Sequence, residues 1–337
     1  MLDSLQTTLV ALQTQPWLFY TVVGLISLFV GSFLNVVIHR LPIMMENAWR
    51  NGCEELAAGT LTPDDSGAIT LAGSQLDAAG ADGIAADSAT ASANHTTNNT
   101  QDDNSDSADV FNLAVPRSRC PSCNQLIKAW QNIPVLSYLL LGGKCANCKS
   151  GISIRYPLVE VTTAALALIC AWQFGPTLQG VAAIVITWFL VALSAIDFDT
   201  QLLPDDLTLP LLWMGLIAST IGVFVGPGTA IIGAAAGYLS LWSVFWLFKL
   251  ITGKEGMGYG DFKLLAALGA WLGWQALPMI ILLSSLVGAV VGITLIVVRG
   301  RDRQIPIPPG PYLAAAGWLA MLWGENLTRA YNNLFAF

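Results

Sequence analysis

The sequence predicts an all-α polytopic membrane protein with about eight transmembrane helices and a cytoplasmic zinc-binding loop. Its mean hydropathy is +0.60, and 54% of its residues are hydrophobic whereas only 11% are charged. Several apolar runs reach the ~20 residues that a helix needs to cross the hydrocarbon core. Two C-x2-C cysteine pairs follow the first of these runs. The composition excludes an ordinary soluble domain.

Residues 1–38 contain the first predicted span, from about Trp17 to Ile38. No Lys or Arg precedes this span, and a cleavable signal peptide is not expected because its basic amino-terminal region is missing. Asn35 and His39 are four residues apart and share a helix face. We expect them to hydrogen-bond a neighbouring helix, with ligand binding as the alternative.

Residues 39–156 form the predicted cytoplasmic loop, which contains an acidic insertion at residues 54–109. The insertion is rich in Ala, Gly, Ser, Thr, Asn and Asp, and such a composition buries too little apolar surface to offset the entropy lost on ordering. We therefore predict that it is disordered. The net charge of −7 is local, because residues 51–116 hold eleven of the 22 acidic residues and no Lys or Arg.

The four-cysteine segment, residues 111–150, is predicted to be a zinc knuckle. Two C-x2-C pairs separated by 21 residues approximate the spacing of zinc ribbons. Four thiolates on two tight turns suit tetrahedral zinc, which folds small modules that lack a core of their own. The alternatives are two disulfides or four free thiols. The predicted ligands are Cys120, Cys123, Cys145 and Cys148.

Residues 157–337 are predicted to form a membrane core of seven helices. Of the 15 Lys and Arg residues, only Arg329 falls outside the cytoplasmic loops if the amino terminus is outside the cell. This distribution fits the rule that basic residues stay in the cytoplasm. The predicted spans lie near residues 17–38, 157–174, 179–196, 207–225, 229–251, 262–275, 277–298 and 311–324.

Two acidic residues are the candidate catalytic pair, Asp197 and Asp261. The predicted topology places both at cytoplasmic helix ends, and intramembrane acids are usually functional. Asp261 follows two glycines that flank Tyr259 and give the backbone freedom. The span at 262–275 is short, since 14 residues rise only ~21 Å, so Asp261 is expected near membrane depth. The alternative is that Asp261 only caps a helix beginning at Phe262.

The motifs together resemble type IV prepilin leader peptidases. They are Gly31 to Pro42, the four cysteines, Ile196 to Asp199 with Leu202 to Asp205, and Gly258 to Asp261. Their order is that of the family, and the resemblance covers nearly the whole chain except roughly residues 51–110. A proline-rich stretch, residues 305–311, has one proline more than expected, and we expect it to touch no catalytic residue.

The resemblance implies a bifunctional enzyme of the bacterial inner membrane with its active site facing the cytoplasm. It implies an intramembrane aspartic protease that removes the basic leader of prepilins and pseudopilins after a glycine. It also implies methylation of the new amino-terminal residue, usually Phe, with S-adenosylmethionine as the methyl donor. Asp197 and Asp261 match the two catalytic aspartates of the family. The expected partners are these substrates and the lipid bilayer, with no nucleic acid.

Other acidic residues have less specific predicted roles. Asp199, Asp205 and Asp206 either cap helices or steer a basic leader peptide. Glu160 either serves methyl transfer or pairs with Arg155. Two other functions compete with the protease: a transporter that uses Asp197 and Asp261 as a proton or cation relay, and a docking module on a passive membrane anchor.

Overall fold

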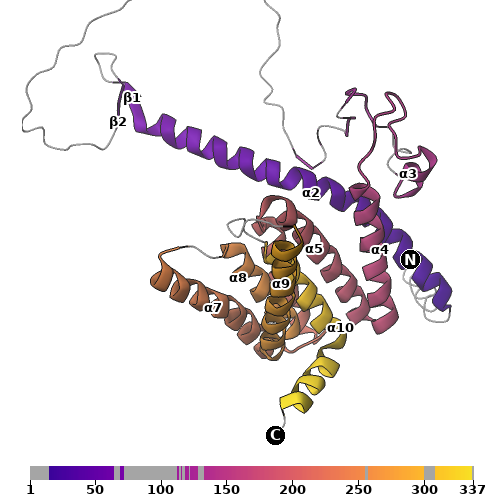
Figure 1. The fold of residues 1–337 in the computed structure, drawn as a ribbon, viewed down its shortest axis with the longest axis vertical. Coiled ribbons are helices and arrows are strands. Elements are labelled where there is room, and N and C mark those ends of the chain that lie inside the picture. Colours follow the sequence, from indigo (N-terminus) through magenta and orange to yellow (C-terminus); the bar gives the residue numbers. More distant parts are fainter. Residues whose placement is uncertain are drawn as a thin grey trace, which may run out of the picture. The chain divides into compact units, whose positions relative to one another are not determined.

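The computed structural model describes nine stretches of the chain, and Figure 1 shows them as a ribbon. By its internal contacts the chain divides into two compact units. The first unit comprises Met1–Ile43 with Arg117–Phe337, and the second comprises Met44–Pro116. The described stretches are residues 15–63, 69–71, 112–113, 115, 118–120, 122–127, 133–254, 257–299 and 308–335.

The described part is predominantly helical, as the sequence predicts (Figure 1). Each predicted span overlaps a helix, although α2 and α10 continue well beyond the predicted ends at residues 38 and 324. The helices are α2 (Pro16–Thr60), α3 (Leu136–Leu140), α4 (Arg155–Phe174), α5 (Leu178–Thr200), α6 (Asp205–Thr220), α7 (Pro227–Thr252), α8 (Tyr259–Leu272), α9 (Leu277–Arg299) and α10 (Gly310–Phe335), with a 3-10 turn, η2 (Trp274–Ala276).

Within the described residues, five helical segments are long and apolar enough to cross a membrane, so the predicted count of eight is not confirmed. These five segments lie in α2, α4, α5, α7 and η2–α9. The 16 residues of α6 and the 14 of α8 are fewer than the ~20 that a full crossing needs. In α10 the backbone departs from helical geometry at Trp323.

The first helix extends well past its predicted end. The sequence predicts a span that stops at residue 38 and disorder from residue 54, whereas α2 continues to Thr60. A short hairpin then pairs β1 (Leu61–Pro63) with β2 (Ile69–Leu71). Ala, Glu, Met and Arg are good helix formers, which lets the helix continue past Pro42 into polar sequence. The rest of the predicted insertion, residues 72–109, lies outside the described residues.

Helix α8 is the buried centre of the membrane core. Ten of its 14 residues are buried, and it packs against α6, α7 and α10. Its backbone touches that of α7, since a Cβ added to Gly269 would lie 2.2 Å from the carbonyl oxygen of Gly233. The Trp271 indole donates a hydrogen bond of 2.9 Å to the Leu211 carbonyl of α6. Enclosure by other helices lets a helix too short to span the membrane lie inside it.

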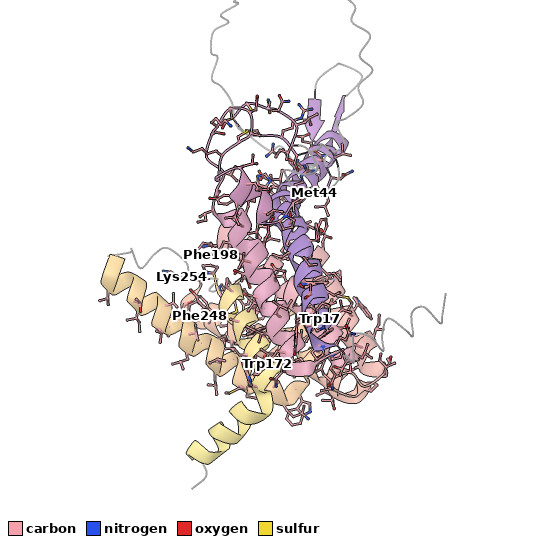
Figure 2. The ribbon with its side chains drawn as sticks, turned by 90° about the vertical axis from the view of Figure 1, so that its right-hand side faces the viewer. Trp17, Met44, Trp172, Phe198, Phe248 and Lys254 are labelled. Carbon is pink, nitrogen blue, oxygen red and sulfur yellow. The ribbon has the colours of Figure 1, made fainter. Side chains whose placement is uncertain are left out.

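Large apolar side chains cover the outer surface of the core. The aromatic residues labelled in Figure 2, Trp17, Trp172, Phe198 and Phe248, all project from their helices and are exposed. Of the five spanning candidates, the segment that contains α9 is the least buried, because only 17% of its 18-residue apolar stretch lies inside the protein. Exposed apolar surface of this extent fits contact with lipid.

Deletion of residues 54–109 is expected to leave the protein inserted in the membrane and active. The deletion removes no helix of the core and none of the four clustered cysteines, and all of it belongs to the separate second unit. Cleavage assays on membranes that contain equal amounts of the deleted and full-length proteins would measure this. A well-expressed but inactive deletion would mean that the segment handles substrate.

Candidate active site and metal centre

Asp197 lies in the last turn of α5, and its side chain is buried, with only 3% of the residue exposed. Its Oδ2 atom accepts a hydrogen bond of 3.0 Å from the backbone N–H of Gly310, the first residue of α10. The helix continues three residues beyond Asp197 to Thr200. The carboxyl group is therefore held between the end of α5 and the start of α10.

Asp261 is the third residue of α8 and is also buried, at 4% exposure. Helix α8 begins at Tyr259 with Gly258 as its cap. Asp261 therefore does not cap a helix that begins at Phe262, and this alternative from the sequence is wrong. Its Oδ1 atom has no hydrogen-bond partner. A buried, unsatisfied carboxyl oxygen costs free energy, and such an atom is a candidate for contact with a ligand or substrate.

The structure brings these two predicted residues together. Gly310, which bonds Asp197, directly follows Pro309, and Pro309 lines the same cavity as Asp261, although 64 positions separate the two aspartates in the sequence. This cavity has a volume of about 230 Å³, and its walls come from α7, α9 and α10. The cavity wall includes Ser284 and Gly288 of α9 and Tyr312 of α10. Two buried carboxyls in one part of the core, one of them on a cavity wall, can perform acid–base chemistry on a bound group.

The segments that carry the two aspartates dock directly on each other. A Cβ added to Gly260 would lie 2.6 Å from the Cβ of Leu203, so only glycine permits this close approach. Beside it the Lys263 Nζ atom contacts both carboxylate oxygens of Asp205, at 2.6 and 2.8 Å. The residues that follow Asp197 are therefore held against the first turns of α8.

Three of the four other acidic residues that the sequence singles out have structural partners. Asp199 pairs with Arg155 of α4, and Asp205 pairs with Lys263, so neither is a free charge that could steer a leader peptide. Glu160 does not pair with Arg155. Its Oε2 atom accepts a hydrogen bond of 2.7 Å from the Val135 amide, which anchors the cysteine loop to α4.

A hydrogen bond also joins the first helix to α4. The Asn35 side chain donates a hydrogen bond of 3.1 Å to the Tyr156 carbonyl at the start of α4. This contact confirms for Asn35 the predicted hydrogen bond to a neighbouring helix.

Gly310 is the residue of this site that the sequence analysis missed. The proline-rich stretch that precedes α10 was expected to touch no catalytic residue, and the contact between Gly310 and Asp197 contradicts this expectation. One signal was available, because a Pro-Gly-Pro start to the last apolar segment lies on the same predicted side of the membrane as both aspartates.

The four predicted metal ligands form one cluster on two similar turns. In the first turn, the Cys120 amide bonds the Gln125 carbonyl and the Asn124 amide bonds the Cys120 carbonyl. The second turn repeats this pattern, with Cys145 bonded to Ser150 and Lys149 bonded to Cys145. Asn124 and Lys149 both have positive φ angles, 57° and 60°. The two C-x2-C pairs are therefore two copies of one turn.

The geometry of the cluster fits a tetrahedral metal ion. The four Sγ atoms lie within 4.8 Å of one another, and those of Cys120 and Cys148 are 3.8 Å apart. A tetrahedron of Zn–S bonds of about 2.3 Å has sulfur–sulfur edges of about 3.8 Å. All four thiols are free of disulfides. The backbone N–H groups of Cys123 and Ser122 lower the pKa of Cys120 to about 6, which favours the thiolate that binds metal.

Comparisons with known proteins identify the family. The bacterial peptidase A24 N-terminal domain matches residues 25–174, and the type IV leader peptidase family matches residues 184–293. A prepilin leader peptidase/N-methyltransferase of Aeromonas hydrophila is 52% identical over 94% of both chains. That of Pseudomonas aeruginosa is 50% identical over 97% of this chain and 98% of its own length. The chain belongs to the type IV leader peptidase family.

The family matches coincide with the two clusters seen in the structure. The N-terminal domain match contains the four clustered cysteines, and the type IV leader peptidase match contains both buried aspartates. Gly310 lies beyond the end of the second match. A prepilin leader peptidase/N-methyltransferase of Legionella pneumophila is 43% identical over 94% of this chain. No solved structure matches the chain.

Purified protein is expected to contain about one zinc ion per chain. Replacement of Cys120 or Cys145 by Ser removes one of four ligands, so zinc should be lost and the loop should become sensitive to protease. Cys53 is an exposed cysteine outside the cluster, so Cys53→Ser is the matched control. Elemental analysis and limited proteolysis measure both effects. Absence of zinc, or two disulfides found by mass spectrometry, would rule out the zinc knuckle.

Proposed function

We propose that this chain is an aspartic endopeptidase that cleaves the basic leader from type IV prepilins and type II secretion pseudopilins after a glycine. It also methylates the new amino-terminal residue, usually Phe. The relatives reported above bear the name prepilin leader peptidase/N-methyltransferase, which supports both activities. None of the comparisons favours a transporter.

The observation that carries the proposal is the pair of buried carboxyl groups beside a cavity. Asp197 bonds Gly310, which follows Pro309 of the cavity wall, and Asp261 lies on the same wall with its Oδ1 unpaired. Two carboxyls in one apolar site share one proton, because ionisation of both is unfavourable. A passive membrane anchor would gain nothing from two such groups.

The shared proton provides both halves of amide hydrolysis. The ionised carboxyl takes a proton from water, which attacks the scissile carbonyl carbon. The protonated carboxyl hydrogen-bonds the carbonyl oxygen, stabilises the negative charge that develops there, and then supplies a proton to the leaving nitrogen. Each carboxyl changes its protonation state during the cycle, and the pair titrates as a unit.

The position of the cavity suits a substrate that lies in the membrane. Its walls include α9, the least buried of the five spanning candidates. A prepilin combines a basic leader with an apolar helix, so its cleavage point lies where cytoplasm and bilayer meet. The distribution of basic residues supports an amino terminus outside the cell and an active site that faces the cytoplasm in the bacterial inner membrane.

The remaining assignments follow from the clusters and from the names of the relatives. Zinc is the proposed ion at Cys120, Cys123, Cys145 and Cys148, where it would hold the two turns together without taking part in hydrolysis. S-adenosylmethionine is the proposed methyl donor, which is supported by the N-methyltransferase in the relatives' name. The proposed organisation is a first span, a cytoplasmic loop at residues 39–156, and a membrane core at residues 157–337.

Replacement of either catalytic aspartate by Asn is expected to lower the cleavage rate by about a thousandfold. Asn keeps the shape of Asp197 or Asp261 but cannot share or transfer the proton. The double variant should lose little more than either single variant, because the two carboxyls act as one unit. Cleavage of one purified prepilin, followed by mass spectrometry, measures these rates.

Asp206→Asn is the matched control for both variants. Asp206 is exposed, and in the described part of the chain it forms no ion pair, so its replacement should leave cleavage near the wild-type rate. Methylation of a pre-cleaved peptide should survive both Asp197→Asn and Asp261→Asn if separate groups perform the two reactions. Substantial cleavage by Asp261→Asn at normal protein levels would disprove the mechanism.

The cavity beside Asp261 is expected to receive the substrate, and Gly288→Leu tests this. A Cβ at Gly288 would meet only the Tyr312 ring, at 3.5 Å, so the larger side chain should enter the cavity without disturbing a helix backbone. We expect kcat/KM to fall about tenfold or more because the added methylene groups exclude substrate. Val290→Leu, at an exposed position of α9, is the control. Equal kcat/KM for the two variants would place the substrate elsewhere.

A further inference from the structure

We propose that Gly310 is a positioning residue that holds the Asp197 carboxylate through its backbone amide and directs the negative charge of the pair to Asp197. This inference rests on the proposed protease function, and it adds an asymmetry between the two aspartates. Gly310 touches neither substrate nor scissile bond in this scheme. It acts through Asp197.

The hydrogen bond is placed by the start of α10. The first N–H groups of any helix have no partner inside that helix, and the N–H of Gly310 is one of them. It donates to Asp197 Oδ2 at 3.0 Å. The positive amino end of α10 also offsets the negative carboxyl end of α5, in whose last turn Asp197 lies. An anionic carboxylate is therefore stabilised at Asp197 by a group that cannot itself ionise.

The two flanking prolines make this amide the only N–H donor in the Pro309–Pro311 tripeptide. Neither Pro309 nor Pro311 has a backbone N–H, and proline also restricts the backbone at the beginning of a helix. Pro309 still contributes its carbonyl, which accepts a hydrogen bond of 3.1 Å from the Leu313 amide. The tripeptide is therefore a rigid start to α10 that presents one N–H to Asp197.

No side chain fits at position 310. A Cβ there would lie 2.6 Å from Asp197 Oδ2 and 3.0 Å from its Cγ. Contacts this short would push the carboxylate out of its place, because a Cβ atom is fixed to the backbone and cannot turn away. Glycine is required here by the close approach of a functional group, and the hydrogen bond depends on that approach.

The partner carboxyl is less completely compensated. Asp261 also lies in the first turn of a helix, α8, next to the Gly258 cap, so the difference from Asp197 lies in its Oδ1 atom. Asp261 is also buried, and its Oδ1 atom has no partner, so nothing at that atom compensates a negative charge. When one proton is shared, it is more favourably placed on Asp261 than on Asp197. The pair then enters catalysis with Asp197 as the base that activates water and Asp261 as the acid that faces the cavity.

The charged groups of the neighbouring helices do not reverse this assignment. Arg155 of α4 is bound to Asp199, and Lys263 of α8 is bound to Asp205 of α6. Glu160 of α4 accepts the Val135 amide. Among the groups described, the Gly310 amide is the hydrogen-bond donor to the Asp197 carboxylate.

The test compares Gly310→Ala with Gly228→Ala in the full-length purified protein. Gly228 lies beside Pro227 in the first turn of α7, where a Cβ would meet nothing within 4 Å. Cleavage of one purified prepilin gives kcat and KM over a range of pH, and thermal unfolding in detergent reports folding. Gly310→Ala should lower kcat about a hundredfold, as expected for a displaced catalytic group, with KM and unfolding like those of Gly228→Ala.

The pH dependence separates positioning from a general loss of structure. Activity requires one ionised carboxyl. If the Gly310 amide no longer stabilises that charge, ionisation requires a higher pH, so the acidic limb of the pH–kcat profile should move upward by about one pH unit. The position of this limb does not depend on the fraction of protein that is folded. A milder variant, Pro311→Gly, adds no atom near Asp197 and should move the limb in the same direction by less.

The outcomes discriminate between the two proposals. If the wild-type protein and Gly228→Ala do not cleave prepilin, the proposed function itself fails. If they cleave, two results would overturn the positioning role. One is that Gly310→Ala cleaves at the same rate as they do. The other is that Gly310→Ala loses activity while the acidic limb stays unshifted in both Gly310→Ala and Pro311→Gly. A lowered kcat with a shifted limb supports it.

Discussion

Two carboxyl groups buried at one end of an apolar helix bundle have lost the water that would stabilise their charge, and the protein has to replace it. The structure stabilises a negative charge unequally at the two carboxyls. Asp197 receives the Gly310 amide and the amino end of α10, whereas Asp261 Oδ1 is left without a partner. This inequality allows one carboxyl to be charged and the other neutral in the same small space, as acid–base chemistry at a buried site requires.

The rest of the core fixes the positions of the two carboxyls relative to each other. Helix α8 carries Asp261, and its position is set by backbone contact between Gly269 and Gly233 of α7 and by the hydrogen bond from Trp271 to α6. The ion pair between Lys263 and Asp205 ties the start of α8 to the segment that follows Asp197. Close packing of this kind tolerates little displacement, so a short helix enclosed by others is a suitable carrier for a residue that must be placed accurately.

The cysteine cluster is stabilised separately from the aspartate pair. Its two turns repeat one hydrogen-bond pattern, and the sulfur positions fit a single tetrahedral ion. The hydrogen bond from the Val135 amide to Glu160 connects the loop to α4, and the bond from Asn35 to Tyr156 connects α2 to α4. Glu160 thereby gains a structural role in holding the loop, although the sequence suggested it as a candidate for methyl transfer.

The sequence alone determined the helical class, the placement of the apolar segments, the four cysteines and the two aspartates, because these depend on local composition and on the spacing of motifs. It misplaced the end of α2, since helix propagation into polar sequence depends on the helix that precedes it. It did not establish the number of full crossings, because whether a short helix such as α8 is enclosed by other helices depends on tertiary packing. Only the tertiary structure showed that Gly310 reaches Asp197, 113 residues away, since no sequence pattern specifies which helix end meets which side chain.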